Sequence, residues 1–521
     1  PEGIATELHR DLFGSIESIK RRNGDGSVQV TRQYVYDAYH RLCKTVEPET
    51  GATVVDYDGA NNIAWSASGV SAPAANSCNR DEALASGRAA TRSYDSRNRV
   101  SGLSFPDGHG DQTWTYYPDG QVKQIVTYNE NRAAWVFNTY EYNKRRLLTR
   151  DRLQLDGVDW SIGQTYTNEG NLDSHIYPGG LTVPYATNAL GQPRQAGTYA
   201  TVVTYFPNGG MSRFTYGNGI VHTLQQNLRG MAERSRDAGN ATVHDDSYDY
   251  DANGNVAAIS DGRPGARGNR TMTYDGVDRL TATASAMFGA ASYSYDVLDN
   301  LRTVSVAGTP TVTGRNQTYL YDQFNRLEMV KTTGTEQMVT ALGYDAQGNL
   351  QYKNQNLFNF DFGNRLREAV GKETYRYDGH GRRVLATSPT LGNIVSMYGR
   401  DGVLRYQRDY RKEKGIAYIH LNGSLVARST TPIAPDVPVV TAPRFVPVTQ
   451  SSFDVSWSAV TSSGSYELQE QANGGSWQGI YTGTGRSRTI SGKTDGNYGY
   501  RVRACSSVGC GGWSATATVA M

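Results

Sequence analysis

The sequence predicts an all-β protein, in which a long array of antiparallel β-hairpins is followed by a small β-sandwich. Three observations lead to this fold class. The 521-residue chain has 35 Tyr but only 12 Phe, and it has 57 Gly. A Tyr-Asp dipeptide recurs through most of the chain in one fixed local frame, and after about residue 442 shorter alternating segments replace it. Tyr, Thr and Val suit pleated, half-buried surfaces, whereas Gly, Asn and Asp suit tight turns.

The repeated frame consists of Tyr-Asp, three turn residues, Arg or Asn, and an apolar residue, as in the segment from Tyr250 to Val256. We expect a strand to end at Tyr-Asp and the apolar residue to begin the returning strand. In this example, Asn253 and Gly254 can take positive φ at low cost. The Asp should accept hydrogen bonds from turn amides. The Tyr ring should cover a neighbouring hairpin while its hydroxyl finds a partner.

The copies of the frame recur at a mean spacing of roughly 23 residues, which indicates a repeat protein. Strong copies begin at Tyr36-Asp37, Tyr57-Asp58, Tyr94-Asp95, Tyr250-Asp251, Tyr274-Asp275, Tyr295-Asp296, Tyr321-Asp322, Tyr344-Asp345 and Tyr377-Asp378. Weaker copies begin at Tyr117, Tyr142, Tyr166, Thr187, Tyr205, Gln226 and Tyr398, and Phe360-Asp361 is a variant. Stacked hairpins bury a shared face and protect all but the terminal edges of the sheet. We therefore expect a β-shell over residues 1–429, and the repeats leave open whether it closes.

The run of YDxxGRL- and YDxxGNL-like frames resembles the Rhs/YD-repeat proteins, a family that includes toxin-complex C components and the YD shells of teneurins. The segment from Tyr418 to Arg428 is also similar to the end of bacterial Rhs cores. The resemblance implies a spiralling hairpin sheet that forms a shell, which encloses a toxin in bacterial members and serves adhesion in teneurins. Many Rhs cores end in an Asp-Pro-x-Gly-Leu segment at which the protein cleaves itself. This sequence has no Asp-Pro dipeptide, so we expect neither self-cleavage nor a toxin within this chain.

The last part of the chain predicts a separate module. A Pro-rich linker is expected at residues 430–447, and a domain of several short strands at residues 442–521. This domain resembles fibronectin type III domains, and the resemblance implies that Trp457 lies in its core and that Tyr498 forms a tyrosine corner.

The four cysteines form two plausible disulfide pairs, Cys43 with Cys78 and Cys505 with Cys510. Such pairing would imply an oxidising compartment. The alternative is four unpaired, buried thiols. Between Cys78 and the next repeat, Asn79 and Glu82 form a modest capping-box signal for one short helix.

No residue pattern predicts a catalytic, cofactor or metal site. His244 beside Asp245-Asp246, and His109 in a Gly-rich turn, are both expected on solvated loops. The segment from Asp249 to Gly254 is similar to the start of a calcium loop, but Ser260 stands where such a loop needs Glu. The repeat frame already explains these residues as turn formers.

Charge and hydropathy argue against binding of nucleic acid and against a membrane-spanning helix. The chain has 52 basic and 50 acidic residues, dispersed along its length, so phosphate-driven binding of nucleic acid is not expected. No window is apolar for the 18 or more residues that a membrane-spanning helix needs. The chain begins at Pro1, which is interpreted as a mature form or a fragment.

The expected function is a non-enzymatic shell of a bacterial secreted or cell-surface Rhs-family protein. In that family such a shell encases or presents a polymorphic toxin. The alternative is a YD-repeat protein for cell-surface adhesion or carbohydrate binding. The expected partner is accordingly a toxin or other protein cargo, or a cell-surface glycan, and no cofactor is expected.

Overall fold

The computed structural model describes residues 2–72, 75–263, 265, 267–447, 449–450, 452–460 and 463–521. Pro1, where the expected shell begins, lies outside these residues. Most of the chain forms a 15-stranded sheet and then a 22-stranded sheet, and in both sheets each strand pairs with its neighbours in sequence. The expected all-β architecture is confirmed.

The strands of the first sheet are β1 (Ala5–Arg10), β2 (Ile16–Arg22), β3 (Gln29–Tyr36), β4 (Leu42–Glu47), β5 (Gly51–Tyr57), β6 (Ile63–Val70), β7 (Ala90–Tyr94), β8 (Val100–Ser104), β9 (Gln112–Tyr116), β10 (Val122–Asn129), β11 (Ala134–Tyr142), β12 (Leu148–Leu155), β13 (Val158–Tyr166), β14 (Leu172–Ile176) and β15 (Thr182–Pro184). The strands of the second sheet are β16 (Ala200–Tyr205), β17 (Met211–Tyr216), β18 (Val221–Gln226), β19 (Ala232–Ala238), β20 (Thr242–Tyr250), β21 (Val256–Asp261), β22 (Arg270–Tyr274), β23 (Leu280–Ser285), β24 (Gly289–Tyr295), β25 (Leu301–Val306), β26 (Arg315–Tyr321), β27 (Leu327–Thr332), β28 (Met338–Tyr344), β29 (Leu350–Lys353), β30 (Asn356–Phe360), β31 (Leu366–Ala369), β32 (Glu373–Tyr377), β33 (Arg383–Ser388), β34 (Gly392–Tyr398), β35 (Leu404–Asp409), β36 (Lys414–Leu421) and β37 (Ser424–Pro432).

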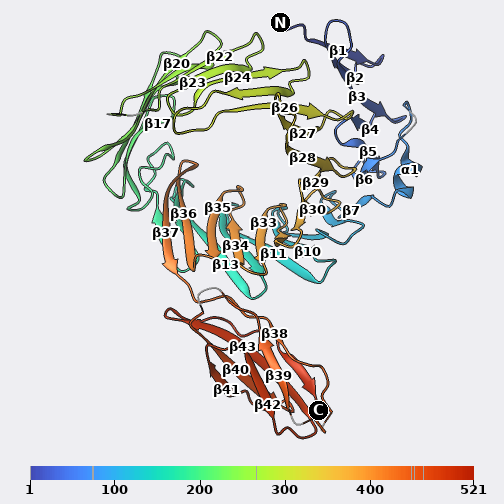
Figure 1. Ribbon diagram of the computed structural model, residues 1–521, viewed down its shortest axis with the longest axis vertical. Helices are drawn as coiled ribbons and strands as arrows, with labels where there is room; N and C mark the ends of the chain where they lie inside the picture. The colour runs from blue at the N-terminus through green and yellow to red at the C-terminus, as the bar shows by residue number, and fades with distance from the viewer. Residues whose placement is uncertain are drawn as a thin grey trace.

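The two sheets curve into one nearly closed shell, so that late strands return to early ones (Figure 1). The strands β26 to β28 lie beside the N-terminal strands, and β33 to β36 lie over β10 to β13. The chain thus makes a first turn and then a second turn that overlies it. We call the line of contact between them the seam.

The largest core cluster lies across this overlap. Val136, Leu153 and Ile162 come from the first turn, and Val384 and Met397 come from the second. All five side chains are almost fully removed from water. Burial of apolar surface therefore stabilises the stacking of the turns as well as each hairpin.

One short helix lies in the connection between two paired strands of the first sheet, as expected. It is α1 (Arg80–Ala85), between β6 and β7. The expected capping box is wrong, because Asn79 has a left-handed backbone and its side chain makes no capping hydrogen bond. The Asn79 amide oxygen instead accepts a hydrogen bond from the buried Lys44 ammonium at 2.8 Å. Tertiary contact has replaced the local cap.

The C-terminal module is a sandwich of two small sheets. Its strands are β38 (Val440–Thr441), β39 (Ser452–Trp457), β40 (Ser465–Ala472), β41 (Gln478–Gly483), β42 (Ser487–Ser491), β43 (Asn497–Ser506), β44 (Gly509–Cys510) and β45 (Ala517–Ala520). The sheets are β38-β39-β42 and a 5-stranded sheet built around β40 and β43. Trp457 is in the core, and the Tyr498 hydroxyl donates to the Thr494 carbonyl at 3.1 Å, which is a tyrosine corner.

The segment between shell and module is shorter than the expected linker. The strand β37 runs to Pro432 and β38 starts at Val440, so both enter the stretch 430–447. Pairing with β36 extends β37 past the expected boundary at residue 429. Among the described residues, no helix is long and apolar enough to cross a membrane.

Candidate functional site at the seam

The repeat turns share one hydrogen-bonding pattern. In the turn from Asp275 to Arg279, the Asp275 amide donates to the Arg279 carbonyl at 2.9 Å, and the Asp278 amide donates back to the Asp275 carbonyl at 3.1 Å. The Asp275 carboxylate accepts from the amides of Val277 and Arg279 at 3.0 and 2.9 Å, and from Arg279 Nε at 2.7 Å. Asp278 has a φ of 63°. This is a three-residue hairpin loop closed by a left-handed residue and a bulge.

The Asp residues of the strong frames have the same role. Each carboxylate accepts a hydrogen bond from the amide four residues on, at Asp37, Asp58, Asp95, Asp251, Asp296, Asp322, Asp345 and Asp378. Of the pair Asn253-Gly254, only Gly254 has positive φ, at 98°. The calcium-like segment is therefore one more repeat turn.

The repeat tyrosines join each hairpin to the preceding one. The Tyr250 hydroxyl donates to the Ala232 carbonyl at 2.7 Å, in the first residue of the preceding returning strand. The same bond is made by Tyr36, Tyr57, Tyr94, Tyr274, Tyr321, Tyr344 and Tyr377. Tyr295 instead lies under the Arg279 guanidinium, 5.0 Å from its ring centroid. These hydroxyls are used within the wall.

One weak frame is placed one residue away from its expected start. The turn begins at Tyr117, so Tyr117 occupies the Asp position and Tyr116 the Tyr position. The Tyr116 hydroxyl donates to the Val100 carbonyl at 2.7 Å. Asp119 supplies the missing turn acceptor by accepting from the Gln121 amide at 3.1 Å. The adjacent tyrosines made both registers plausible in the sequence.

The seam joins residues that are about one turn of the shell apart. Arg21 Nε donates to the Val297 carbonyl at 2.8 Å across 276 positions, and the Tyr177 hydroxyl donates to the Tyr418 carbonyl across 241 positions. Between these ends, the contacts advance along both turns together. The second turn therefore follows the first in register.

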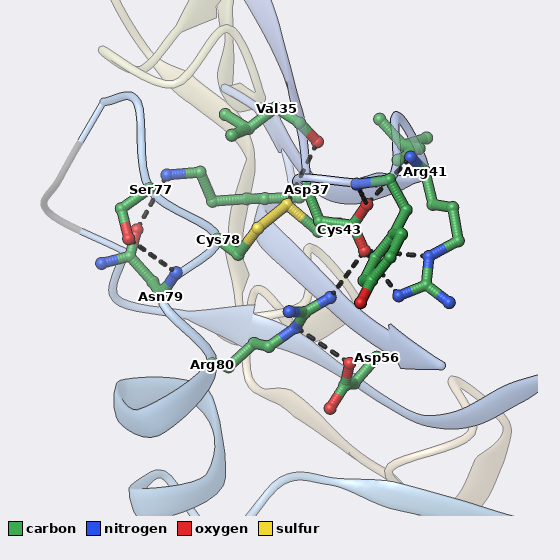
Figure 2. The surroundings of a disulfide bond; sticks show 12 residues. Val35, Asp37, Arg41, Cys43, Asp56, Ser77, Cys78, Asn79 and Arg80 are labelled. Atoms are coloured by element: carbon green, nitrogen blue, oxygen red, sulfur yellow. Dashed lines mark hydrogen bonds and ion pairs between the residues drawn. A yellow bond between two sulfur atoms is a disulfide. The ribbon is translucent and has the colours of Figure 1, made fainter. Parts of the chain in front are cut away.

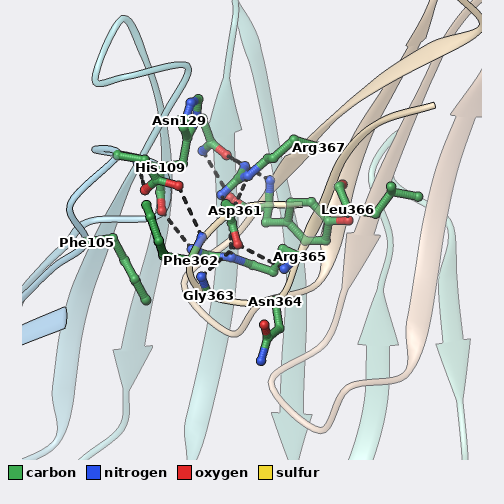
Figure 3. A network of polar contacts seen from close by, with 12 residues as sticks. Phe105, His109, Asn129, Asp361, Phe362, Gly363, Asn364, Arg365, Leu366 and Arg367 are labelled. Atoms are coloured by element: carbon green, nitrogen blue, oxygen red, sulfur yellow. Dashed lines mark hydrogen bonds and ion pairs between the residues drawn. The ribbon is translucent and has the colours of Figure 1, made fainter. Parts of the chain in front are cut away.

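A polar network of the seam surrounds Asp361 (Figure 3). Its fully buried carboxylate contacts Arg365 Nε at 2.9 Å and Arg367 Nε at 2.6 Å. Arg365 then donates to the His109 carbonyl at 2.8 Å, and Arg367 donates to the Asn129 side-chain oxygen at 2.6 Å. Asp361 belongs to a repeat hairpin in the second turn of the shell. It thereby positions two guanidinium groups against the first turn of the shell.

Two buried asparagines bind the main chain of the opposite turn. Asn129 donates to the Tyr377 carbonyl at 3.2 Å and accepts from the Tyr377 amide at 3.1 Å. Asn138 accepts from the Gly379 amide at 3.0 Å. Because an unpaired buried peptide group is costly, these side chains fix where the second turn can lie.

A group of titratable side chains lies next to these asparagines. The Tyr140 hydroxyl and His380 Nε2 are 2.6 Å apart. Burial raises the pKa of Tyr140 and lowers that of His380. Burial also raises the pKa of Asp151 to about 7, although the charge of Arg382 opposes this. Asp151 is directly opposite Tyr140 in the sheet, and its Oδ2 has no hydrogen-bond partner among the described residues.

The first disulfide ties the helical insertion to the shell (Figure 2). The structure joins Cys43 to Cys78 and Cys505 to Cys510, the two pairs considered from the sequence. Beside the first pair, Arg80 reaches Asp37 at 3.1 Å and Asp56 at 3.0 Å. The insertion is therefore joined covalently to β4 and by an ion pair to the repeat turn at Asp37.

His244 and His109 were both expected on solvated loops, and the structure places only His109 in a turn. His244 lies in β20, so the expectation of a solvated loop is wrong there. The neighbouring Asp245 and Asp246 are buried and pair with arginines, at 2.7 Å from Arg234 and 3.0 Å from Arg270. His109 lies in a turn whose main chain is held at the seam. Among the described residues, Glu467, Cys505 and Cys510 alone form a metal-like group, and its sulfurs are joined in the disulfide.

Comparison with protein-family models and with curated proteins gives no match to this sequence. Solved structures do match. The Photorhabdus luminescens Tc holotoxin pore, with a mutated TccC3, covers 87% of this chain at 14% identity and a TM-score of 0.53. The TcdB2–TccC3 crystal structure covers 87% at 13% identity and a TM-score of 0.52. These alignments take in 25% and 26% of the matched chains, so this chain spans about a quarter of their length.

The crystal structure of FN3tt also aligns, at 18% identity, with 16% of this chain and 95% of its own, with a TM-score of 0.15. The identities to the toxin-complex structures are low, and the likeness is one of fold. The chain therefore has the fold of an Rhs-like β-shell, similar to that in the TcdB2–TccC3 structures, followed by a small β-sandwich with the tyrosine corner of fibronectin type III domains.

Proposed function

We propose that this chain forms part of the wall of a bacterial shell that encloses or presents a polypeptide cargo, and that it acts without catalysis. The seam is the observation that carries this proposal. Its buried side chains bond main-chain groups of the opposite turn. A wall bonded across its turns separates two spaces, whereas a sheet with free edges would recruit other strands.

Three further observations support the proposal. Two solved structures with a similar fold are a Tc holotoxin pore and TcdB2–TccC3, so a toxin is the first candidate for the cargo. The two disulfides favour an oxidising location, either secreted or at the cell surface. The repeat Tyr side chains bond the preceding hairpin and the repeat Asp side chains bond the amides of their own turn, so both have a structural use.

The test is protease protection of the natively purified protein. Intact particles are treated with a broad-specificity protease, the protease is inactivated, and the protected polypeptides are identified by mass spectrometry. We expect a resistant shell, with early cleavage between Pro432 and Val440, and a protected polypeptide that is not part of the wall. A resistant shell without any protected polypeptide contradicts the cargo, and rapid cleavage within the repeats contradicts the shell.

A second candidate is cell-surface adhesion, because the module stands outside the shell (Figure 1). The repeat tyrosines do not support a glycan surface, since their hydroxyls are bound within the wall. A glycan array with the intact protein separates the two functions. Selective binding without a protected cargo would favour adhesion, and a blank array with a protected cargo would favour the shell.

A further inference from the structure

Lys44 and Asn79 form a buried pair beside the first disulfide. Lys44 lies on β4, and Asn79 immediately precedes α1. The two residues are only 1% and 3% exposed, and Lys44 Nζ lies 2.8 Å from the side-chain oxygen of Asn79. Lysine is rarely buried to this degree. The pair therefore places an amine against a carboxamide in a site that is shielded from water.

The chain is anchored on both sides of Asn79 (Figure 2). On one side, Cys78 is joined to Cys43, which is the neighbour of Lys44. On the other side, two aspartates of the shell hold Arg80 at 3.1 and 3.0 Å. The carboxamide is therefore fixed against the lysine. Two reactive groups held in contact in this way can react in a unimolecular step, without the cost of an encounter.

Glu82 contacts the nitrogen of the same carboxamide. Asn79 Nδ2 donates to Glu82 Oε1 at 3.3 Å. Burial lowers the pKa of Lys44, although the charge of Glu82 opposes this. The neutral amine of a buried lysine is a nucleophile, and a carboxylate at this distance can carry a proton. A nucleophile, a carbonyl carbon and a proton carrier thus meet at one place.

We propose that Lys44 and Asn79 join spontaneously in an intramolecular isopeptide bond. The Lys44 amine attacks Cγ of Asn79, so that an Nζ–Cγ bond forms and the Cγ–Nδ2 bond breaks. Glu82 takes one proton from the attacking nitrogen and delivers it to Nδ2, which leaves as ammonia. The reaction needs no oxidant, reductant or further reactant. It occurs once in each chain and turns over no outside substrate, so it is compatible with a wall that acts without catalysis.

The isopeptide bond would tie the insertion to the shell independently of redox conditions. It closes the same separation of 35 residues as the neighbouring disulfide, one position further along the chain. A reducing compartment opens disulfides, whereas an amide is not reduced there. The insertion would thus stay attached to β4 where the disulfide alone would release it.

The test is a peptide map of the intact, natively purified protein after its disulfides have been reduced and alkylated. Trypsin cleaves after Lys44 only if the amine is unmodified, and no lysine or arginine lies between residues 45 and 79. A second, glutamate-specific protease then cleaves after Glu49. We expect residues 42–49 and 50–80 to remain joined through the two side chains, with one ammonia less than the separate peptides. Ordinary fragments that end at Lys44 would overturn the proposal, and so would a loss of ammonia without the branched peptide.

The chain offers an internal control and two informative variants. Lys372 Nζ also donates to a carboxamide oxygen, that of Asn356, but both residues are exposed and the Asn356 nitrogen donates to a main-chain carbonyl. This pair should stay unjoined in the same digest, and equal joining of it would overturn the role of the buried site. Lys44→Met should abolish the branched peptide. Glu82→Gln, which keeps the size of the side chain, should slow its formation at least tenfold. Thermal unfolding shows that each variant is folded, and an unchanged rate in folded Glu82→Gln would overturn the proton transfer by Glu82.

Discussion

The hydroxyl of Tyr140 lies 2.6 Å from Nε2 of His380, although 240 positions separate the two residues in the chain. Tyr140 belongs to a strand of the first turn, and His380 belongs to a repeat turn of the second. Their contact shows how the wall is built. The repeat frame forms each hairpin from nearby residues, and the seam then sets one turn of hairpins upon the other. The predictions below separate these two levels.

Removing a seam asparagine should destabilise the shell strongly. Asn129→Ala leaves the amide and carbonyl of Tyr377 and the Arg367 guanidinium without their buried partner, which should cost about 3 kcal/mol of unfolding free energy. Chemical denaturation followed by fluorescence measures the change. The control is the exposed Asn359→Ala, which should lie within about 0.5 kcal/mol of wild type. Similar small losses in both variants would show that Asn129 does not hold the turns together.

The buried Asp151 carboxyl should make the shell less stable as pH rises. Its ordinary pKa is 3.8, and in the folded protein it is about 7. The folded state therefore binds the proton more tightly than the unfolded state. The stabilisation from this proton is complete below about pH 4, decreases between the two pKa values, and is absent above about pH 7. The total effect is roughly 4 kcal/mol.

Asp151→Asn isolates this effect, because the amide cannot ionise. The difference in unfolding free energy between the variant and wild type, measured from pH 4 to 8, should move in favour of the variant as pH rises. A difference that stays constant over this range would contradict a raised pKa for Asp151.

The repeat tyrosine hydroxyls should each contribute modestly. Tyr250→Phe keeps the ring and removes the hydrogen bond to the Ala232 carbonyl, so it should cost about 1 kcal/mol. The matched control is Tyr352→Phe, since the Tyr352 hydroxyl makes no hydrogen bond among the described residues and its side chain is exposed. Equal stability of both variants in urea denaturation would mean that repeat hydroxyls do not join the hairpins.

The two disulfides should differ in how much they contribute to the free energy of unfolding. Cys43–Cys78 closes a separation of 35 residues and Cys505–Cys510 one of 5. Chain entropy gives roughly 4 and roughly 2 kcal/mol respectively. Calorimetry should show that Cys43→Ala/Cys78→Ala lowers the stability of the shell in its unfolding transition by the larger amount. Cys505→Ala/Cys510→Ala should lower the stability of the module in its own transition by the smaller amount. A larger loss in the second variant would contradict this assignment.

The repeat turns could be predicted from the sequence because their contacts are local. The Asp275 carboxylate reaches amides two and four residues on, so the dipeptide and the following Arg279 already specify the turn. The tyrosine corner at Tyr498 is similarly local. Where two tyrosines stand together, as at Tyr116 and Tyr117, the sequence allowed both registers, and in the structure it is the Tyr116 hydroxyl that donates to the Val100 carbonyl.

The seam could not be predicted in the same way. Asn129 and Asn138 are ordinary residues of alternating strands, and nothing nearby indicates that their side chains bind a main chain about 240 positions later. Their role depends on the twist and curvature accumulated over many hairpins. The Asn79 cap failed for a related reason, because Lys44 competes for its side chain. The solvated loop expected at His244 is wrong because Asp245 and Asp246 pair with arginines from neighbouring strands, which the local sequence does not indicate.

The overlap of the two turns is tested most directly by a distance between spin labels at positions 130 and 376, where Glu130 and Arg376 form an ion pair at 2.6 Å. Spin labels are attached in the double variant Glu130→Cys/Arg376→Cys, and the distance between them is measured by pulsed electron paramagnetic resonance. Each single-label variant serves as a control. The account predicts one narrow distribution at the short end of the measurable range. If the hairpins formed a flat, open array, β10 and β32 would be on the order of 100 Å apart at the usual strand spacing. A missing or broad, long-distance signal from the folded protein would contradict the overlap.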